Sequence, residues 1–111
     1  MPRGEQILTI TEWLLLAAIM RNDNNAYGSV IFDTASELAR PTKVSYGSLY
    51  PTLERLERQG FLSSSFSEPI PERGGRSRRY FSVTAAGQKV MKRSEQVVRR
   101  IAGADAAWRI A

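Results

Sequence analysis

The chain has 111 residues, 42% of them hydrophobic and 24% charged, which suits a single domain spanning residues 1–111 with one hydrophobic core. It contains neither cysteine nor histidine, which excludes disulfides, Cys/His zinc sites and every histidine-dependent catalytic mechanism. Neither the pair Glu54 and Glu57 nor the run Ser63–Ser65 has a base beside it, so we expect no enzyme, no metal and no cofactor.

The charge is distributed unevenly along the chain. Residues 1–72 carry six basic and nine acidic side chains, whereas residues 73–111 carry ten basic and two acidic ones. This asymmetry favours a polyanionic partner over a merely solubilising surface. The longest apolar run, Trp13–Met20, is too short to cross a bilayer, and no secretion signal precedes it, so a cytoplasmic protein is expected.

The first predicted helix covers about residues 7–20, which are apolar on almost every side. Thr9 and Glu12 have the spacing of a capping box. A helix that is apolar all round must be covered on more than one face, so one face should meet the core and another a second subunit. Trp13 fits either face.

A turn at Asn22–Asn25 precedes a second, amphipathic helix. Its apolar residues recur at helical spacing from Tyr27 to Leu38, and Pro41 should end it. The following segment, Thr42–Val44, could add a short strand to a later hairpin.

Ser45 is a suitable N-cap for a third helix, and Gly60 stands where that helix should stop. The favoured start is near Tyr46, because this keeps the apolar stripe in phase, although a turn as far as Tyr50 is the alternative. The expected buried stripe comprises Leu49, Leu53 and Leu56.

The opposite face of this third helix is small and polar at its start and cationic later. Small residues let a helix enter a groove, and its free N–H groups favour a nearby phosphate. Glu54 could accept a hydrogen bond from cytosine, but its spacing makes a surface pair with Arg58 the preferred interpretation. The exposed face comprises Gly47, Ser48, Pro51, Glu54, Arg55 and Arg58.

Two short strands follow, with Leu62, Ser64 and Phe66 on one face of the first and Arg79, Phe81 and Val83 on one face of the second. Two prolines and two glycines between them predict a hairpin over about residues 61–83 with a projecting loop at its tip. Arginine suits phosphate and the narrow minor groove of DNA. Four arginines crowd this hairpin, namely Arg73, Arg76, Arg78 and Arg79.

The last helix is expected over about residues 85–110, capped by Thr84 and weakened near its end by Gly103. Its apolar positions follow a heptad-like spacing, so it should pack on a copy of itself, the alternative being packing on its own domain only. This seam comprises Val90, Ser94, Val97, Ile101, Ala104 and Trp108.

Several motifs resemble, in the same order, those of the PadR-like bacterial transcriptional regulators. They cover roughly residues 7–100 and are Ala26–Gly28, Tyr46–Glu57, Gly60–Leu62, Gly74–Gly75, Arg79–Phe81 and Thr84–Gly87. The resemblance implies a fold that is mainly α with a small β hairpin (α+β). In such a winged helix-turn-helix the amino- and carboxy-terminal helices form a homodimer.

The resemblance also implies a repressor that binds a near-palindromic operator in double-stranded DNA, with half-sites about one helical turn apart. Ser45–Tyr50 would enter the major groove, Tyr27 and Tyr50 would touch the backbone, and the wing arginines would bind DNA. Lys43, Arg55 and Arg58 are expected on phosphates. The complete expected set is Tyr27, Lys43, Ser45, Tyr46, Gly47, Ser48, Tyr50, Arg55, Arg58, Arg73, Arg76, Arg78 and Arg79.

Two other functions compete with a simple repressor. In a ligand sensor, Trp13 and Trp108 would line a cavity at the dimer interface and stack on a planar aromatic effector. In a protein-interaction module, the wing would bind no DNA. The expected dimer interface comprises Trp13, Leu14, Val90, Ser94, Val97, Ile101 and Trp108.

Overall fold

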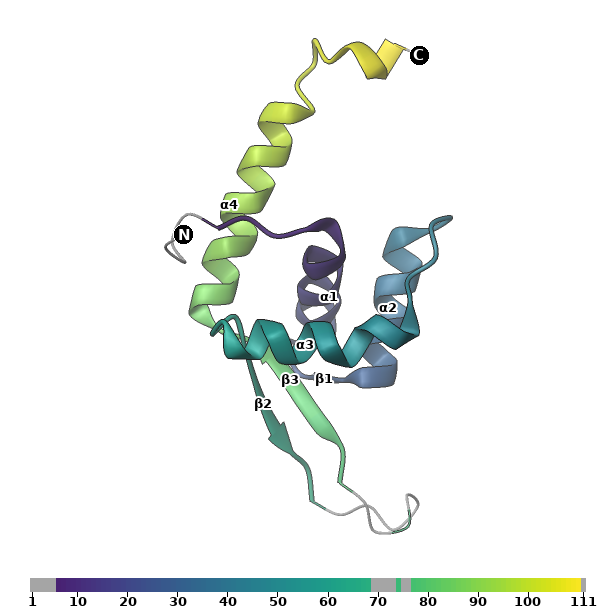
Figure 1. Cartoon of the computed structure of the whole chain (residues 1–111), viewed down its shortest axis with the longest axis vertical. Coiled ribbons are helices and arrows are strands. Elements are labelled where there is room, and N and C mark those ends of the chain that lie inside the picture. Colours follow the sequence, from purple (N-terminus) through teal and green to yellow (C-terminus); the bar gives the residue numbers. More distant parts are fainter. Residues whose placement is uncertain (1–5, 69–73, 75–76, 111) are drawn as a thin grey trace.

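The computed structural model describes residues 6–68, 74 and 77–110 of the chain. Three helices pack together beside a small antiparallel sheet, and a fourth helix extends away from them, with the strands β2 and β3 pointing to the opposite end (Figure 1). Across the described residues, none of the helices combines the length and the apolarity that a transmembrane span requires. The elements in order are α1 (Ile10–Arg21), β1 (Ala26–Tyr27), α2 (Gly28–Ala39), the 3-10 helix η2 (Tyr46–Ser48), α3 (Leu49–Arg58), β2 (Leu62–Phe66), β3 (Arg79–Val83), α4 (Ala85–Ile101) and the 3-10 helix η4 (Ala107–Ile110).

Helix α1 begins at Ile10 rather than near residue 7, because the predicted capping box forms at its start. The Thr9 Oγ1 accepts from the Glu12 amide at 3.1 Å, and the Thr9 amide donates to Glu12 Oε1 at 2.8 Å. The preceding arm is extended and fastened to α4. There the buried amide of Leu8 donates to Ser94 Oγ at 2.8 Å.

The sheet has three strands in the order β1-β3-β2, all antiparallel. The third strand is Ala26–Tyr27, so the strand considered at Thr42–Val44 was wrong. The predicted turn before Ala26 explains the pairing. In that turn the Asn24 side chain accepts from the Val83 amide at 2.7 Å and donates to the Val83 carbonyl at 3.2 Å. These two hydrogen bonds continue the pairing between β1 and β3 by one further position, with the Asn24 side chain in place of a strand backbone.

The predicted alternation of β2 and β3 is confirmed, with Leu62, Phe81 and Val83 buried and Ser64 opposite Phe81. Between α3 and β2 the backbone turns through Gly60, whose φ of 85° suits glycine. The core lies where α1, α2 and α3 meet the sheet and the start of α4. Its largest fully buried hydrophobic side chains are Phe81, Leu15, Leu16, Ile19, Ile31, Leu49, Leu53, Leu56 and Val90.

Helix α4 ends at Ile101, so the helix expected as far as about residue 110 is shorter than predicted. A non-helical segment separates it from η4. Val98 and Ile101 are exposed, so the last turns of α4 receive little support from packing within the chain, and Gly103 further disfavours helix.

Candidate nucleic-acid interface

The segment that was expected to enter DNA begins as a 3-10 helix and continues as α3. Helical structure starts at Tyr46 as predicted, but the α-helix itself starts only at Leu49, with Leu49, Leu53 and Leu56 buried on the inner face. Ser45 precedes η2 with an extended backbone, but its side chain makes no capping hydrogen bond, contrary to the prediction. Instead its carbonyl accepts from Ser48 Oγ at 3.0 Å.

The outer face at this start is open to a partner. Gly47 is exposed, and the side chains of Tyr46 and Tyr50 are 55% and 41% exposed. The Tyr46 ring packs edge-on against Phe32 of α2, with centroids 5.0 Å apart, which fixes its direction without covering it. The face therefore offers two oriented aromatic hydroxyl groups beside small residues.

A polar cleft of about 360 Å³ lies beside this face, between the starts of α2 and α3 and the base of the hairpin. A Cβ atom at Gly28 would overlap the Tyr50 hydroxyl group, so glycine at this position lets Tyr50 lie across the start of α2. The N-cap of α2, Tyr27, makes no side-chain capping bond. The free amides in the first turn of α2, together with the dipole of that helix, therefore favour an anion in this cleft. The cleft is lined by Tyr27, Gly28, Ser29, Tyr46, Tyr50, Phe66, Ser77, Arg78 and Arg79.

Arg78 and Tyr27 form one wall of the cleft. The Arg78 guanidinium carbon lies 4.3 Å from the Tyr27 ring centroid, and Tyr27 packs edge-on against Tyr80 at 5.4 Å. The Arg78 Nε is buried without a hydrogen-bond partner in the described part of the chain. A buried donor without a partner is costly.

Two of the arginines expected on phosphates are occupied inside the chain. Arg55 Nη2 lies 3.1 Å from Glu12 Oε2 of α1, and the Glu12 side chain is only 7% exposed. Arg79 is bound to both Glu54 and Glu57 of α3. All three guanidinium nitrogens of Arg79 have acceptors, whereas Arg55 uses only Nη2 in its ion pair and its side chain is 47% exposed.

The other expected cations on this side differ. Lys43 and Arg58 are exposed and form no ion pair in the described regions, so both remain available. The surface pair preferred between Glu54 and Arg58 does not form, because Glu54 pairs with Arg79 at 3.4 Å. Arg73 and Arg76 lie outside the described residues.

Phe66 and Ser29 also line the cleft, and neither was predicted as a site residue. Phe66 is 71% exposed on the same strand face as the buried Leu62. The alternation of β2 could have revealed it, because an aromatic residue on the inward face beyond the core must meet either solvent or a partner.

The residues expected at a dimer interface fall into two groups. Val90 and Ser94 are buried inside their own chain, at 1% and 2% exposure, so neither faces a second copy here. The packing of α4 against its own domain therefore uses two of the six residues of the predicted seam. Ile101 and Trp108 are 60% and 57% exposed, and Val97 is half-buried.

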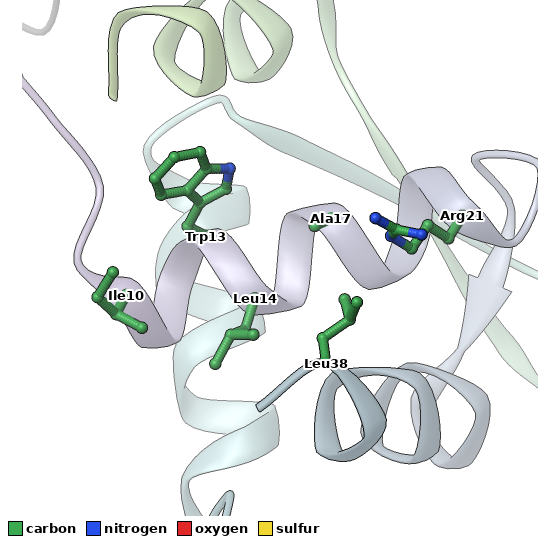
Figure 2. A pocket seen from close by; sticks show the side chains of 6 residues that line it. All are labelled: Ile10, Trp13, Leu14, Ala17, Arg21 and Leu38. Atoms are coloured by element: carbon green, nitrogen blue, oxygen red, sulfur yellow. The ribbon is translucent and has the colours of Figure 1, made fainter. Parts of the chain in front are cut away.

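Trp13 and Leu14 line an apolar pocket of about 210 Å³ on α1. Figure 2 shows its six side chains, with Leu38 of α2 approaching Leu14 and the indole of Trp13 directed away from them. Ile10, at 65% exposure, extends this apolar surface and was not among the predicted interface residues. Trp108 does not line this pocket, so the two tryptophans do not meet there within one chain.

Comparisons with known proteins agree with this architecture. Residues 15–93 match the model described as the transcriptional regulator PadR-like family. The transcriptional regulator Rv3488 of Mycobacterium tuberculosis is 35% identical over 81 residues, which are 72% of this chain and 69% of that protein.

Solved structures share the fold at lower identity. A PadR family transcription regulator from hypervirulent Clostridium difficile R20291 has a TM-score of 0.68 at 22% identity, covering 84% of this chain and 91% of that one. F93 from STIV, a winged-helix DNA-binding protein, has a TM-score of 0.67 at 16% identity, covering 89% and 98%.

Proposed function

The chain belongs to the PadR-like family of transcriptional regulators, and from this premise we propose that it is a homodimeric repressor of a near-palindromic operator. Each copy would insert the start of α3 into the major groove of one half-site. We expect the protein to have no catalytic activity. It would act in the cytoplasm beside the DNA.

The observation that carries this proposal is the exposed start of α3 beside the polar cleft. A side chain on Tyr46–Ser48 could contact base edges, while the cleft receives a backbone phosphate between the α2 amides, the Tyr50 hydroxyl group and Arg78. Because the two surfaces adjoin, one duplex could occupy both.

DNA retained from fragments of the source genome, followed by footprinting, tests the central claim. We expect two protected half-sites with centres about one helical turn apart. Retention of no DNA would instead favour the protein-interaction module and contradict the proposed function.

The free cations give a quantitative test. Removing one phosphate contact should reduce the slope of log K against log salt by about one. We therefore expect a smaller slope for Arg58→Ala, measured by fluorescence anisotropy on the recovered operator. Arg100→Ala, which removes an exposed charge near the end of α4, is the matched control and should leave the slope unchanged.

The exposed apolar residues of α1 and α4 support the dimer. Ile10 on α1, Val98 and Ile101 on α4, and Trp108 on η4 lie in the segments expected at the interface and have little covering within the chain. Sedimentation equilibrium should give a dimer that Ile101→Glu dissociates. Gln96→Glu introduces the same charge on an exposed polar position of α4 and should leave the dimer intact. A monomer at all concentrations would contradict the proposal.

A second candidate, a ligand-responsive regulator, rests on the apolar pocket beside Trp13. A planar aromatic effector could stack on the indole there. The chain has two tryptophans, so Trp108→Phe leaves Trp13 as the sole reporter. Titration with planar drugs and phenolic acids should quench this variant but not Trp13→Phe. Absence of quenching in both would indicate that Trp13 serves only packing.

A further inference from the structure

Arg79, at the start of β3, is bound on every side by its own chain. Its Nη2 donates to Glu57 Oε1 at 2.5 Å, and its Nη1 lies 3.4 Å from Glu54 Oε1. Its Nε donates to Ser64 Oγ at 3.1 Å, and that hydroxyl group donates onward to Glu57 Oε2 at 2.7 Å. Every nitrogen of the guanidinium therefore has an acceptor.

The surroundings hold this side chain in place. The guanidinium carbon lies 4.8 Å from the centroid of Phe81, a ring that is fully buried, and the Arg79 side chain is 26% exposed. One cation faces two carboxylates, so the cluster carries a net negative charge. Such a cluster would not attract a phosphate, although Arg79 also lines the edge of the polar cleft.

The cluster joins two parts that must meet DNA together. Glu54 and Glu57 belong to α3, Ser64 to β2 and Arg79 to β3. The residue beside it, Arg78, stacks on Tyr27 of β1. The base of the hairpin is thus fixed both to the helix that enters the groove and to the strand next to the cleft.

We propose that Arg79, with Glu57 and Glu54, is a positioning group that sets the angle of the hairpin to α3 and does not itself bind DNA. This inference rests on the proposed function, in which α3 and the hairpin engage one duplex. Loss of an acidic side chain near DNA would by itself reduce repulsion and strengthen binding. If these glutamates position the hairpin, removing either one should instead weaken binding.

The decisive variant is Glu57→Gln, which keeps the shape and removes the charge. If Glu57 acted on DNA only through its charge, the variant would bind more tightly. If it positions the hairpin, affinity should fall roughly tenfold with an unchanged salt slope, because the network loses its strongest bond and no phosphate contact. Glu37→Gln removes a more exposed charge on α2, with a side-chain exposure of 65% against 30% for Glu57, and should change affinity less than about twofold.

Arg79→Lys separates positioning from phosphate binding at the cation itself. Lysine binds phosphate well as a point charge but cannot span two carboxylates and a hydroxyl group as the guanidinium does. We expect Arg79→Lys to weaken binding as much as Arg79→Gln, and neither should alter the salt slope. The double variant Glu57→Gln/Arg79→Gln should be no worse than either single variant, since both remove the same network.

Hydrogen–deuterium exchange of the free protein tests the cluster without DNA. In Glu57→Gln the amides of β2 and β3 should exchange several-fold faster, while those of α4 remain at the parent rate. Unchanged exchange in β2 and β3, or operator binding by Glu57→Gln as tight as the parent's, would overturn the inference. A parent protein that retains no genomic DNA would overturn the proposed function instead, and the exchange experiment would still decide the role of Arg79.

Discussion

The two halves of the segment Tyr46–Arg58 are treated very differently by the rest of the molecule. Its first half, Tyr46–Tyr50, is exposed on its outer face and makes no ion pair in the described structure. In its second half, Glu54, Arg55 and Glu57 are all paired with α1 or β3. Under the proposed function, this difference leaves one end of the segment free to contact DNA, while the ion pairs at the other end hold the orientation of the helix.

Arg58 closes the second half and forms no ion pair with any described residue, which makes it a natural control for Arg55. From sequence the two arginines look equivalent. In the structure Arg55 pairs with Glu12 and supports the fold, whereas Arg58 is available to a partner.

We expect the largest effect from Arg55→Ala, which removes the ion pair between the second half of the segment and α1. The nearly buried carboxylate of Glu12 would lose its cation while keeping the hydrogen bond from Thr9. We expect the free energy of unfolding, measured by chemical denaturation, to fall by about 1–3 kcal/mol. Arg58→Ala should change it by less than about 0.5 kcal/mol. Equal losses in both variants would remove the distinction between the two arginines.

A change in the free half should affect binding without affecting stability. Tyr50→Phe removes a hydroxyl group that makes no hydrogen bond within the described residues and faces the cleft. Loss of one hydrogen bond to a charged group should lower operator affinity about tenfold. Tyr80→Phe, on a ring that packs against Tyr27 but does not line the cleft, is the control. Comparable weakening in both would argue against a phosphate in the cleft.

Glu12 belongs to the capping box of α1 and also pairs with Arg55. It therefore links the start of α1 to the second half of the segment Tyr46–Arg58. Thr9→Ala removes the cap but leaves the Glu12–Arg55 pair. The free energy of unfolding should fall by about 1 kcal/mol, with affinity per folded molecule unchanged. Thr11→Ala, an exposed change in the same turn, should be neutral or slightly stabilising. A marked loss of affinity in Thr9→Ala would show that the cap also orients α3.

The smallest effect is expected for Ser48→Ala in the free half. Its hydrogen bond to the Ser45 carbonyl is exposed, so the stability change should stay within about 0.5 kcal/mol. Its operator preference should nonetheless shift at one base pair, which selection from a randomised half-site would detect. An unchanged preference would place base recognition on other residues of the exposed face.

The sequence predicted local features well, since these depend on residues close together in the chain. The leucine stripe of α3, the capping box of Thr9 and the alternation of β2 and β3 were all correct. The strand Ala26–Tyr27 was missed because two residues show no period, and its pairing depends on an asparagine side chain that reaches Val83.

Whether a charged or apolar side chain packs within the chain or faces a partner was harder to predict, because this depends on tertiary contacts. Arg55 finds Glu12, which is 43 residues away in the chain. Likewise, the heptad-like spacing of Val90 and Ser94 correctly marked a buried face of α4, but spacing alone does not distinguish a core from a second copy.

The bond between Leu8 and Ser94 has a consequence for the order in which the chain can fold. The two residues are 86 positions apart, and the Leu8 amide is buried. During synthesis the amino terminus emerges first, so α1 is complete long before the ribosome releases the partner of this amide. Contacts so distant in sequence also slow folding. Helix α4, made after α1, α2 and α3, is therefore the one that secures the segment before α1.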